Sequence, residues 1–208
     1  MKTILCYGDS NTYGSTAAGG RFARDERWTG ILQTLLGDGY YVVEEGCPGR
    51  TTVWDDPIEE GKNGKRYLLP CLNSHRPIDF IVIMLGTNDL KNRFSLSPTD
   101  IQWGMENLID KIQKSDCGVD GKAPGILLVC PIQVGTLSHL SQILIGAKEK
   151  CAQLPALYRQ LAERKGVLYL NAGEYAEPDE ADGLHIDKAG HKNLAKALYE
   201  KILSACEQ

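Results

Sequence analysis

Short, continuous apolar runs recur along the chain, separated by segments with helical periodicity. The runs hold four to six residues each and do not alternate apolar with polar positions. A strand covered by helices on both faces has this pattern, because neither of its faces meets water. We therefore predict five buried strands of a parallel sheet, at Thr3–Tyr7, Tyr40–Val43, Phe80–Leu85, Ile126–Cys130 and Val167–Leu170.

Four further segments carry apolar residues at the spacing of one helix face. Ser97 offers an N-cap to the segment that begins at Pro98, and Asp187 offers one to the segment that begins at Lys188. The segment that begins at Leu154 is predicted to follow an earlier helix that is broken near Pro155. The predicted helices are Trp28–Leu36, Pro98–Lys114, Leu154–Arg164 and Lys188–Ala205. Strands that alternate with helices indicate one α/β domain over residues 1–208, a doubly wound three-layer sandwich with a five-stranded parallel sheet.

Two connections are longer than is usual in a compact domain. Residues 53–78 contain a polar stretch from Glu59 to Arg66, whereas residues 131–145 are apolar. The apolar connection has two interpretations: one more core helix, or a segment that covers substrate or contacts another subunit. Long loops of this kind commonly contain local structure or shape a site.

Compact polar clusters follow four of the predicted strands. In a parallel sheet the carboxyl ends of the strands meet at one edge, where ligands bind. Each cluster alone has a simple structural explanation, such as a helix cap or an Asx turn. Their joint occurrence at one edge of the sheet is the informative observation. The clusters are Gly8-Asp9-Ser10-Asn11, Gly46-Cys47-Pro48-Gly49-Arg50-Thr51-Thr52, Gly86-Thr87-Asn88-Asp89 and Asp182-Gly183-Leu184-His185.

These residue types suit acyl transfer to a serine. The Ser10 hydroxyl needs a neighbouring base, which His185 can supply, and Asp182 can hold the imidazole in the required tautomer. Ester cleavage also requires donors that face the oxyanion, and the candidates are the backbone N–H groups of Ser10 and Gly49 and the Asn88 side-chain amide. The four clusters therefore predict a serine hydrolase. Asp9 is expected to fix the turn beside the nucleophile.

The same four blocks resemble those of the SGNH (GDSL-like) hydrolases. Gly-Asp-Ser lies near the N-terminus, a glycine in the second block, Gly-x-Asn-Asp in the third and Asp-x-x-His near the C-terminus. The Gly49–Thr52 and Met84–Lys91 segments are similar to the bacterial arylesterase and acyltransferase branch. This resemblance implies a flavodoxin-like fold, small acetyl-type or aryl ester substrates, an acyl-enzyme that passes its acyl group to water or an alcohol, and a homo-oligomer.

Carbohydrate O-deacetylases and lysophospholipases or thioesterases share these blocks, so the substrate stays open at this point. Asn11 stands where the family commonly has leucine, which we expect to affect the pocket lining. Tyr13, Trp54 and Ile186 flank the expected site and are candidates to line the acyl or alcohol pocket, although simple packing is the alternative. A different class of function, a flavodoxin-like nucleotide- or phosphate-binding module, is disfavoured by the acidic Asp9 and by the absence of a phosphate-loop motif.

Composition excludes several partners. The net charge is −4 and the 23 lysines and arginines are spread along the chain, which argues against nucleic-acid and membrane partners. The seven cysteines occur singly, which indicates a reducing, cytoplasmic setting without a complete disulfide set. His75, His139 and His191 have no evident partners in the sequence, so we expect them to be surface or loop histidines, and we predict no metal and no cofactor. No apolar run approaches membrane-spanning length.

Overall fold

Five parallel strands form the central sheet of the computed structural model, which describes residues 1–206. The strand order is β2-β1-β3-β4-β5. Each predicted strand is present, and its ends differ from the prediction by no more than three residues, so the expected fold class is confirmed. The strands are β1 (Lys2–Gly8), β2 (Tyr40–Gly46), β3 (Phe80–Met84), β4 (Gly125–Cys130) and β5 (Leu168–Asn171).

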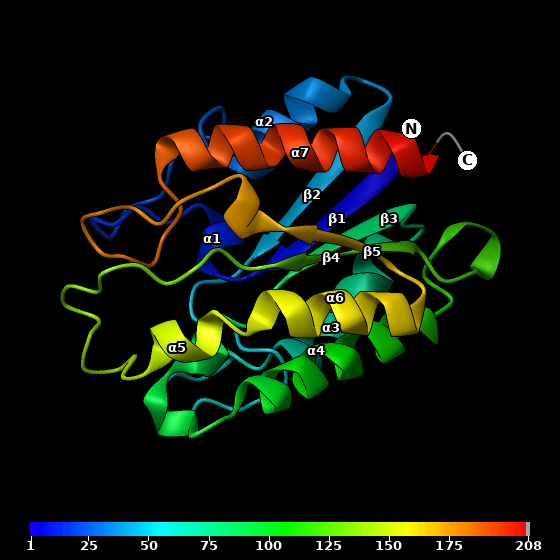
Figure 1. Ribbon diagram of the computed structural model, residues 1–208. Helices are drawn as coiled ribbons and strands as arrows, with labels where there is room; N and C mark the ends of the chain where they lie inside the picture. The colour runs from blue at the N-terminus through cyan, green and yellow to red at the C-terminus, as the bar shows by residue number, and fades with distance from the viewer. Residues whose placement is uncertain (207–208) are drawn as a thin grey trace.

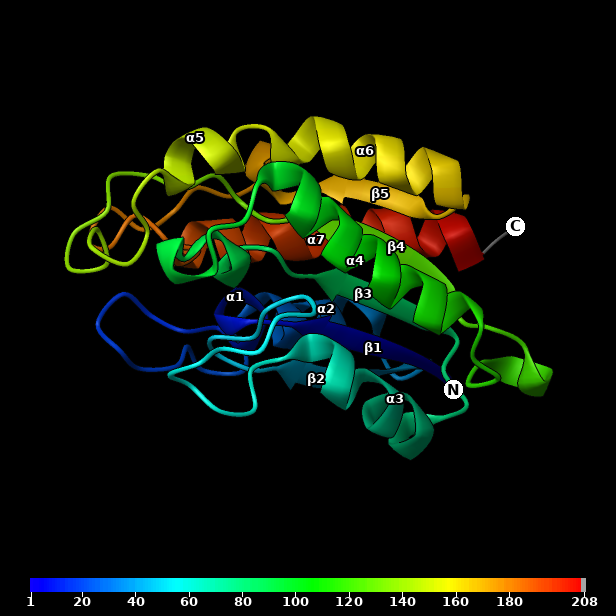
Figure 2. The same ribbon diagram turned by 90° about the horizontal axis from the view of Figure 1, so that it is seen from below.

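Helices cover both faces of this sheet. In Figure 1, α2 and α7 lie on one side of the strands, and α3, α4 and α6 lie on the other; Figure 2 shows the second group from below. The four predicted helices correspond to α2, α4, α6 and α7. The helices are α1 (Ser10–Tyr13), α2 (Trp28–Leu36), α3 (Gly64–His75), α4 (Pro98–Gln113), α5 (Ala147–Cys151), α6 (Leu154–Lys165) and α7 (Lys188–Cys206).

Alternate side chains of each strand enter two separate hydrophobic cores. On β1, Ile4 and Cys6 pack into the core under α2 and α7, whereas Leu5 and Tyr7 pack into the core under α3, α4 and α6. All four side chains are fully buried. Burial on both faces explains why the strand sequences are continuously apolar.

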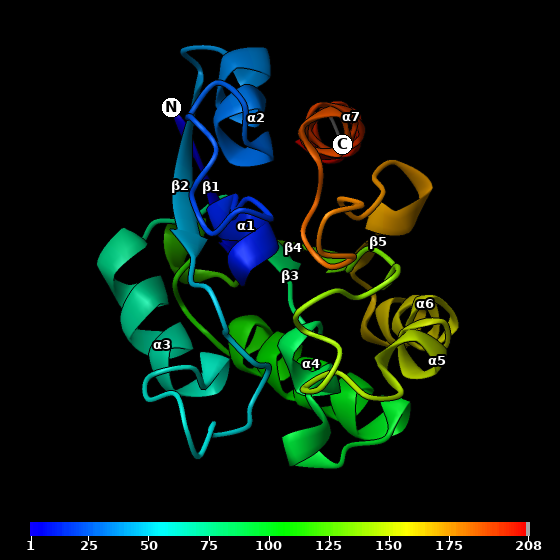
Figure 3. The same cartoon turned by 90° about the vertical axis from the view of Figure 1, so that its left-hand side faces the viewer.

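The long connections differ from each other in structure. Residues 53–78 contain α3, a helix that was not predicted from the sequence. Residues 131–145 contain no helix, so the core-helix interpretation of this apolar connection is wrong. The segment runs instead as an extended loop toward the end of the molecule where α1 and α5 lie (Figures 1 and 3).

The order of the strands creates a switch point between β1 and β3. The chain passes from β1 to β2 on one side of β1, and then returns to place β3 on the other side. Loops that leave two such neighbouring strands diverge and open a crevice between them. Ser10 follows β1 and Asn88 follows β3, so both begin at this crevice.

The cysteines and the hydropathy of the helices were both considered in the sequence predictions. The six cysteines other than Cys206, whose side chain lies outside the described part of the chain, are free thiols. Among the helices of residues 1–206, none combines the length and apolar character needed to cross a membrane.

Candidate active site

Ser10 begins a short helix directly at the end of β1. The Asp9 carboxylate caps this helix by accepting a hydrogen bond from the Asn11 backbone N–H at 2.9 Å, which is the turn-fixing role expected of Asp9. The turn lies very close to the sheet, because a Cβ atom at Gly46 would stand 2.2 Å from the Tyr13 backbone nitrogen. Glycine at this position therefore lets the turn that carries Ser10 pack directly against the ends of the strands.

Asp182 and His185 form a compact unit within one turn. The Asp182 Oδ2 atom lies 2.6 Å from His185 Nδ1, and Oδ1 accepts the backbone N–H groups of Leu184 at 2.8 Å and His185 at 3.0 Å. Asp182 is 1% exposed. Burial alone would raise the pKa of this carboxyl, but the hydrogen bonds from His185 and Leu184 outweigh it and leave the pKa below its usual value. The charged carboxylate thus binds Nδ1 and leaves Nε2 for a reaction.

The Asn88 side chain is held at the start of the 3-10 helix Asn88–Leu90. Its Nδ2 atom donates to the Arg50 carbonyl at 3.2 Å, and the second contact of this amide, to Asp9 Oδ2, is longer at 3.5 Å. Gly49 lies in the neighbouring loop with a φ of 83°, a backbone conformation that favours glycine. Asn88 and Gly49 therefore approach the turn that carries Ser10 from the ends of two different strands.

One cavity of about 560 Å³ unites these groups. Ser10, Gly49, Asn88 and His185 all line it, and Asp182 lies behind the imidazole. Helix α1, which begins with Ser10, lies at the end of the molecule that faces the viewer in Figure 3. Residues from four separate strand ends thus meet in a single pocket, as their order along the chain predicted.

The apolar wall of the cavity comes mainly from the extended loop 131–145. Leu140, Ile143 and Leu144 line the pocket, and Tyr13 lines it from α1. This position beside the cavity fits the substrate-covering alternative of the second interpretation, and contact with another subunit stays a prediction. No periodic pattern could have revealed this, because the loop is neither helix nor strand.

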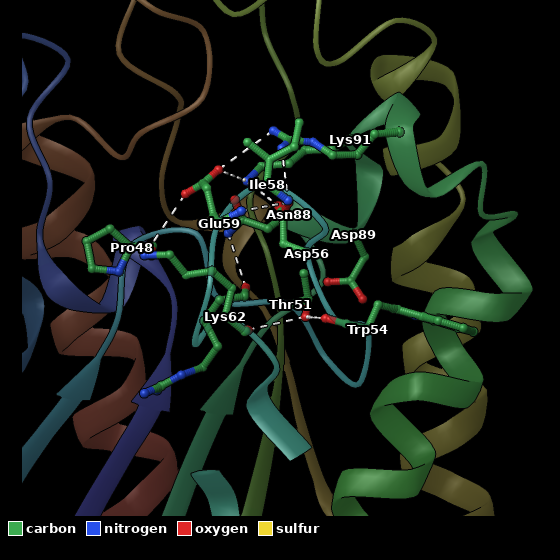
Figure 4. A network of polar contacts seen from close by, with 12 residues as sticks. Pro48, Thr51, Trp54, Asp56, Ile58, Glu59, Lys62, Asn88, Asp89 and Lys91 are labelled. Carbon is green, nitrogen blue, oxygen red and sulfur yellow. Dashed lines mark hydrogen bonds and ion pairs between the residues drawn. The ribbon is translucent and has the colours of Figure 1, made fainter. Parts of the chain in front are cut away.

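Three other residues expected to line the pocket lie elsewhere. Asn11 is 2% exposed and Ile186 is 1% exposed, and neither is part of the cavity wall. Trp54 packs against the core cluster that includes α4, and Figure 4 shows its ring pointing toward a helix and away from Asn88. Of the four candidates, Tyr13 alone lines this cavity.

Buried acids connect the loops of the site. Asp89 accepts the Thr52 backbone N–H through both carboxylate oxygens, at 3.1 and 3.0 Å, and accepts the Thr52 hydroxyl through Oδ1. Burial raises the pKa of Asp89 to about 7 and that of Asp9 to about 6, although hydrogen bonds oppose the rise in each case. The Asp89–Thr52 pair ties the loop after β2 to the loop after β3.

Arg50 was not assigned a role from the sequence, yet it anchors the second loop. Its guanidinium donates to the carbonyls of Gly8 and Glu45, and it lies 4.2 Å from the centre of the Tyr7 ring. The side chain is 5% exposed. Arg50 therefore joins the end of β1 to the loop that carries Gly49.

Charged side chains form a network on the outer side of the loop that carries Gly49 (Figure 4). Lys91 lies 3.0 Å from Glu59 and 3.5 Å from Asp56, and Lys62 donates to the Pro48 carbonyl at 2.8 Å. Glu59 and Lys91 also line the cavity. The segment that carries Gly49 is consequently held from both sides.

The histidines differ from expectation. His191 is fully buried in α7, where Nδ1 accepts the Trp28 backbone N–H at 3.2 Å, so its prediction as a surface or loop residue is wrong. Burial lowers the pKa of His191 to about 4. His75 was predicted to lack a partner, but its Nε2 atom lies 2.8 Å from Glu45 Oε1. His139 lies in the exposed part of the 131–145 loop, as expected.

One group of possible metal ligands occurs among the described residues, formed by Glu45, Cys71 and His75. The Glu45 carboxylate already binds the His75 ring, and burial raises the pKa of the Cys71 thiol to about 12. The nearby Arg50 guanidinium acts against this rise, and its positive charge would also repel a cation. The group is therefore better explained as a hydrogen-bonded Glu45–His75 pair beside a buried thiol.

Comparisons with known proteins agree with this geometry. The chain is 39% identical to an aryl esterase of M. smegmatis, with a TM-score of 0.93 over 98% of this chain and 99% of that one. It is 34% identical to a carbohydrate acetylesterase from Sinorhizobium meliloti, with a TM-score of 0.94 over 99% of this chain and 100% of that one. No curated protein matched. The profile of the GDSL-like Lipase/Acylhydrolase family matches residues 6–192. The chain therefore belongs to the GDSL-like lipase/acylhydrolase family, the SGNH hydrolases.

Proposed function

We propose that this protein is a serine esterase that cleaves small acyl esters through an acyl-enzyme. Ser10 is the nucleophile, His185 is the general base, and Asp182 orients the imidazole and stabilises the imidazolium that forms when His185 takes the serine proton. The observation that carries the proposal is that His185, bound through Nδ1 by Asp182, lines the same cavity as Ser10. Such an arrangement leaves Nε2 to take the hydroxyl proton.

The reaction follows from these positions. The Ser10 Oγ atom attacks the ester carbonyl carbon while Nε2 of His185 accepts the hydroxyl proton. The carbonyl oxygen becomes an oxyanion, stabilised by the N–H groups of Ser10 and Gly49 and by the Asn88 amide. Collapse of this intermediate expels the alcohol, which takes the proton from His185. Water then attacks the acyl-enzyme by the reverse sequence of proton transfers and releases the acid.

The lining of the cavity supports small substrates with an apolar part. Leu140, Ile143 and Leu144 offer an apolar wall beside the candidate oxyanion donors, and about 560 Å³ suffices for an aryl acetate. An apolar wall also disfavours water relative to an alcohol as the second acceptor, so we include acyl transfer in the proposal. Addition of benzyl alcohol should then divert part of the product from acetate to benzyl acetate.

Acetylated carbohydrates are the second candidate substrate class, because the likeness to a carbohydrate acetylesterase covers nearly the whole of both chains. Parallel assays with 4-nitrophenyl acetate and a peracetylated monosaccharide separate the two classes by their kcat/KM values. Family membership decides against the nucleotide- or phosphate-binding module. The homo-oligomer and the cytoplasmic setting remain predictions, and sizing chromatography tests the first.

The direct test compares hydrolysis of 4-nitrophenyl acetate by the wild type and by Ser10→Ala. Loss of a triad nucleophile typically lowers turnover by about 10⁶-fold, so the variant should fall to the background rate. Ser74→Ala, which alters an exposed serine of α3, is the matched control and should keep full activity. Equal rates for Ser10→Ala and the wild type would refute the proposal.

A further inference from the structure

Asn11 connects the nucleophile turn to the loop that carries His185. Its Nδ2 atom donates to the Leu184 carbonyl at 3.4 Å, and its Oδ1 atom accepts the Ile186 backbone N–H at 2.9 Å. These two hydrogen bonds hold the residues immediately before and immediately after His185. Asn11 itself follows Ser10 directly, so a single side chain spans the two halves of the site.

The polar groups of Asn11 are used on every side. Its backbone N–H donates to Asp9 Oδ1 at 2.9 Å, and its carbonyl accepts the Trp28 indole N–H at 2.9 Å. The side chain is 2% exposed and lies outside the cavity wall. Hydrogen bonds on every side hold this side chain in one position, and it makes no direct contact with a substrate in the cavity.

The other contacts of the His185 loop cannot replace the two hydrogen bonds of the Asn11 side chain. Asp182 lies three residues from His185 on the same loop, so it orients the ring without fixing the distance from the loop to β1. The Gly183 carbonyl accepts the Gly135 N–H at 2.8 Å, which ties the loop to the segment after β4. Among the described hydrogen bonds, those of Asn11 are the ones that join this loop to the residue next to Ser10.

We propose that Asn11 is a positioning residue that sets the distance between the Ser10 hydroxyl and the His185 imidazole. The inference rests on the proposed function of these two groups. The Asn11 amide supplies both the donor for Leu184 and the acceptor for Ile186, whereas leucine supplies neither.

The test measures kcat and KM for 4-nitrophenyl acetate in Asn11→Leu. A displacement of about 1 Å between reacting groups costs about 10²-fold in rate, so kcat should fall by about 10- to 100-fold. KM should change by less than about twofold, since Asn11 does not line the cavity. The rate at which an organophosphonate labels the serine should fall in parallel with kcat, because labelling needs the same proton transfer.

Two further variants separate positioning from mere loss of stability. Asn11→Gln keeps both a donor and an acceptor without adding a buried charge, so it should recover part of the lost kcat; it also gives a second variant to measure if Asn11→Leu does not fold. Leu161→Ala removes a fully buried side chain of α6 and destabilises the fold without contact to the site. Measured well below its melting temperature, Leu161→Ala should keep the wild-type kcat.

The outcomes distinguish the two proposals. Wild-type kcat and labelling rate in folded Asn11→Leu, while Ser10→Ala is inactive, would overturn the positioning role and leave the esterase intact. An equal loss of kcat in Leu161→Ala would also overturn the positioning role, because it would trace the effect to stability. Wild-type activity that persists in Ser10→Ala would overturn both.

Discussion

Asp182 holds His185 with both of its carboxylate oxygens, one on the ring and one on the backbone. Oδ2 lies 2.6 Å from Nδ1, and Oδ1 accepts the His185 N–H at 3.0 Å. The same carboxylate thereby sets the shape of the turn and the tautomer of the imidazole. The Asp-x-x-His spacing is short because both bonds must close within a single turn.

Replacement of Asp182 by asparagine should lower kcat by about 10⁴-fold with little change in KM, because an amide that donates to Nδ1 selects the wrong tautomer. The matched control is Glu180→Gln, which alters an exposed acid on the same loop. Steady-state kinetics on 4-nitrophenyl acetate measure both. A kcat within tenfold of the wild type in Asp182→Asn would show that the carboxylate has no part in catalysis.

Asn88→Ala should reduce kcat by about 10²–10³-fold, the usual cost of one oxyanion donor, and leave KM nearly unchanged. Asn92→Ala serves as the control, since Asn92 is exposed and lies outside the cavity. Single-turnover acylation monitored by release of 4-nitrophenol reports the step directly. If Asn88→Ala acylates as fast as Asn92→Ala, the amide does not stabilise the oxyanion.

Ile143 and Ile145 form a natural pair for testing the apolar wall. Ile143 is 38% exposed and lines the cavity, whereas Ile145 is 59% exposed and does not. Truncation of Ile143 to alanine removes about 1 kcal/mol of apolar contact, so kcat/KM for 4-nitrophenyl butyrate should fall about fivefold. Ile145→Ala should leave it unchanged. Equal values for the two variants would place the substrate elsewhere in the cavity.

His191 makes stability depend on pH. Burial lowers its pKa from 6.5 to about 4 in the folded protein. Below about pH 6.5 the unfolded chain takes up a proton that the folded chain refuses, so the stabilising contribution of His191 falls as the pH falls toward 4. Relative to His191→Gln, the wild type should lose about 2 kcal/mol of unfolding free energy between pH 8 and pH 5.

Urea unfolding of both variants at the two pH values measures this difference. The raised pKa values of Asp9 and Asp89 give the opposite slope, since folded protein then holds protons that are lost as the pH rises. Their contribution is common to the wild type and to His191→Gln, so it cancels in the comparison. A difference that is independent of pH would mean that His191 titrates in the folded protein as it does in the unfolded chain.

The sequence predicted the sheet well because each strand is buried on both faces, which leaves a continuous apolar run as its signature. It also predicted which residues meet at the site, since parallel strands must end at one edge. It did not predict α3, where Pro70 lies inside the helix and a polar stretch overlaps its first turn, so that no helical periodicity was evident. Tertiary contacts at Leu68 and Leu72 stabilise this helix instead.

Roles that depend on long-range contacts were beyond the sequence. Asn11 was expected to line the pocket because it follows Ser10, but the helical turn of α1 directs it to the His185 loop. His191 was assigned to the surface because no partner was evident, yet its partner is a backbone N–H of α2, 163 residues away in the chain. Neither pairing leaves a local pattern that could be recognised.

The proposed reaction depends on a Ser10 hydroxyl that His185 activates, and covalent labelling with an aryl organophosphonate tests this step most directly. Intact-mass measurement should show one adduct per chain, and peptide mapping should place it on Ser10. His185→Gln should slow the labelling by at least about 10³-fold, because the hydroxyl then lacks its base. The proposed activation of Ser10 by His185 would be contradicted by any of three results: a wild type that is not labelled, an adduct on another residue, or equal labelling rates in the wild type and His185→Gln.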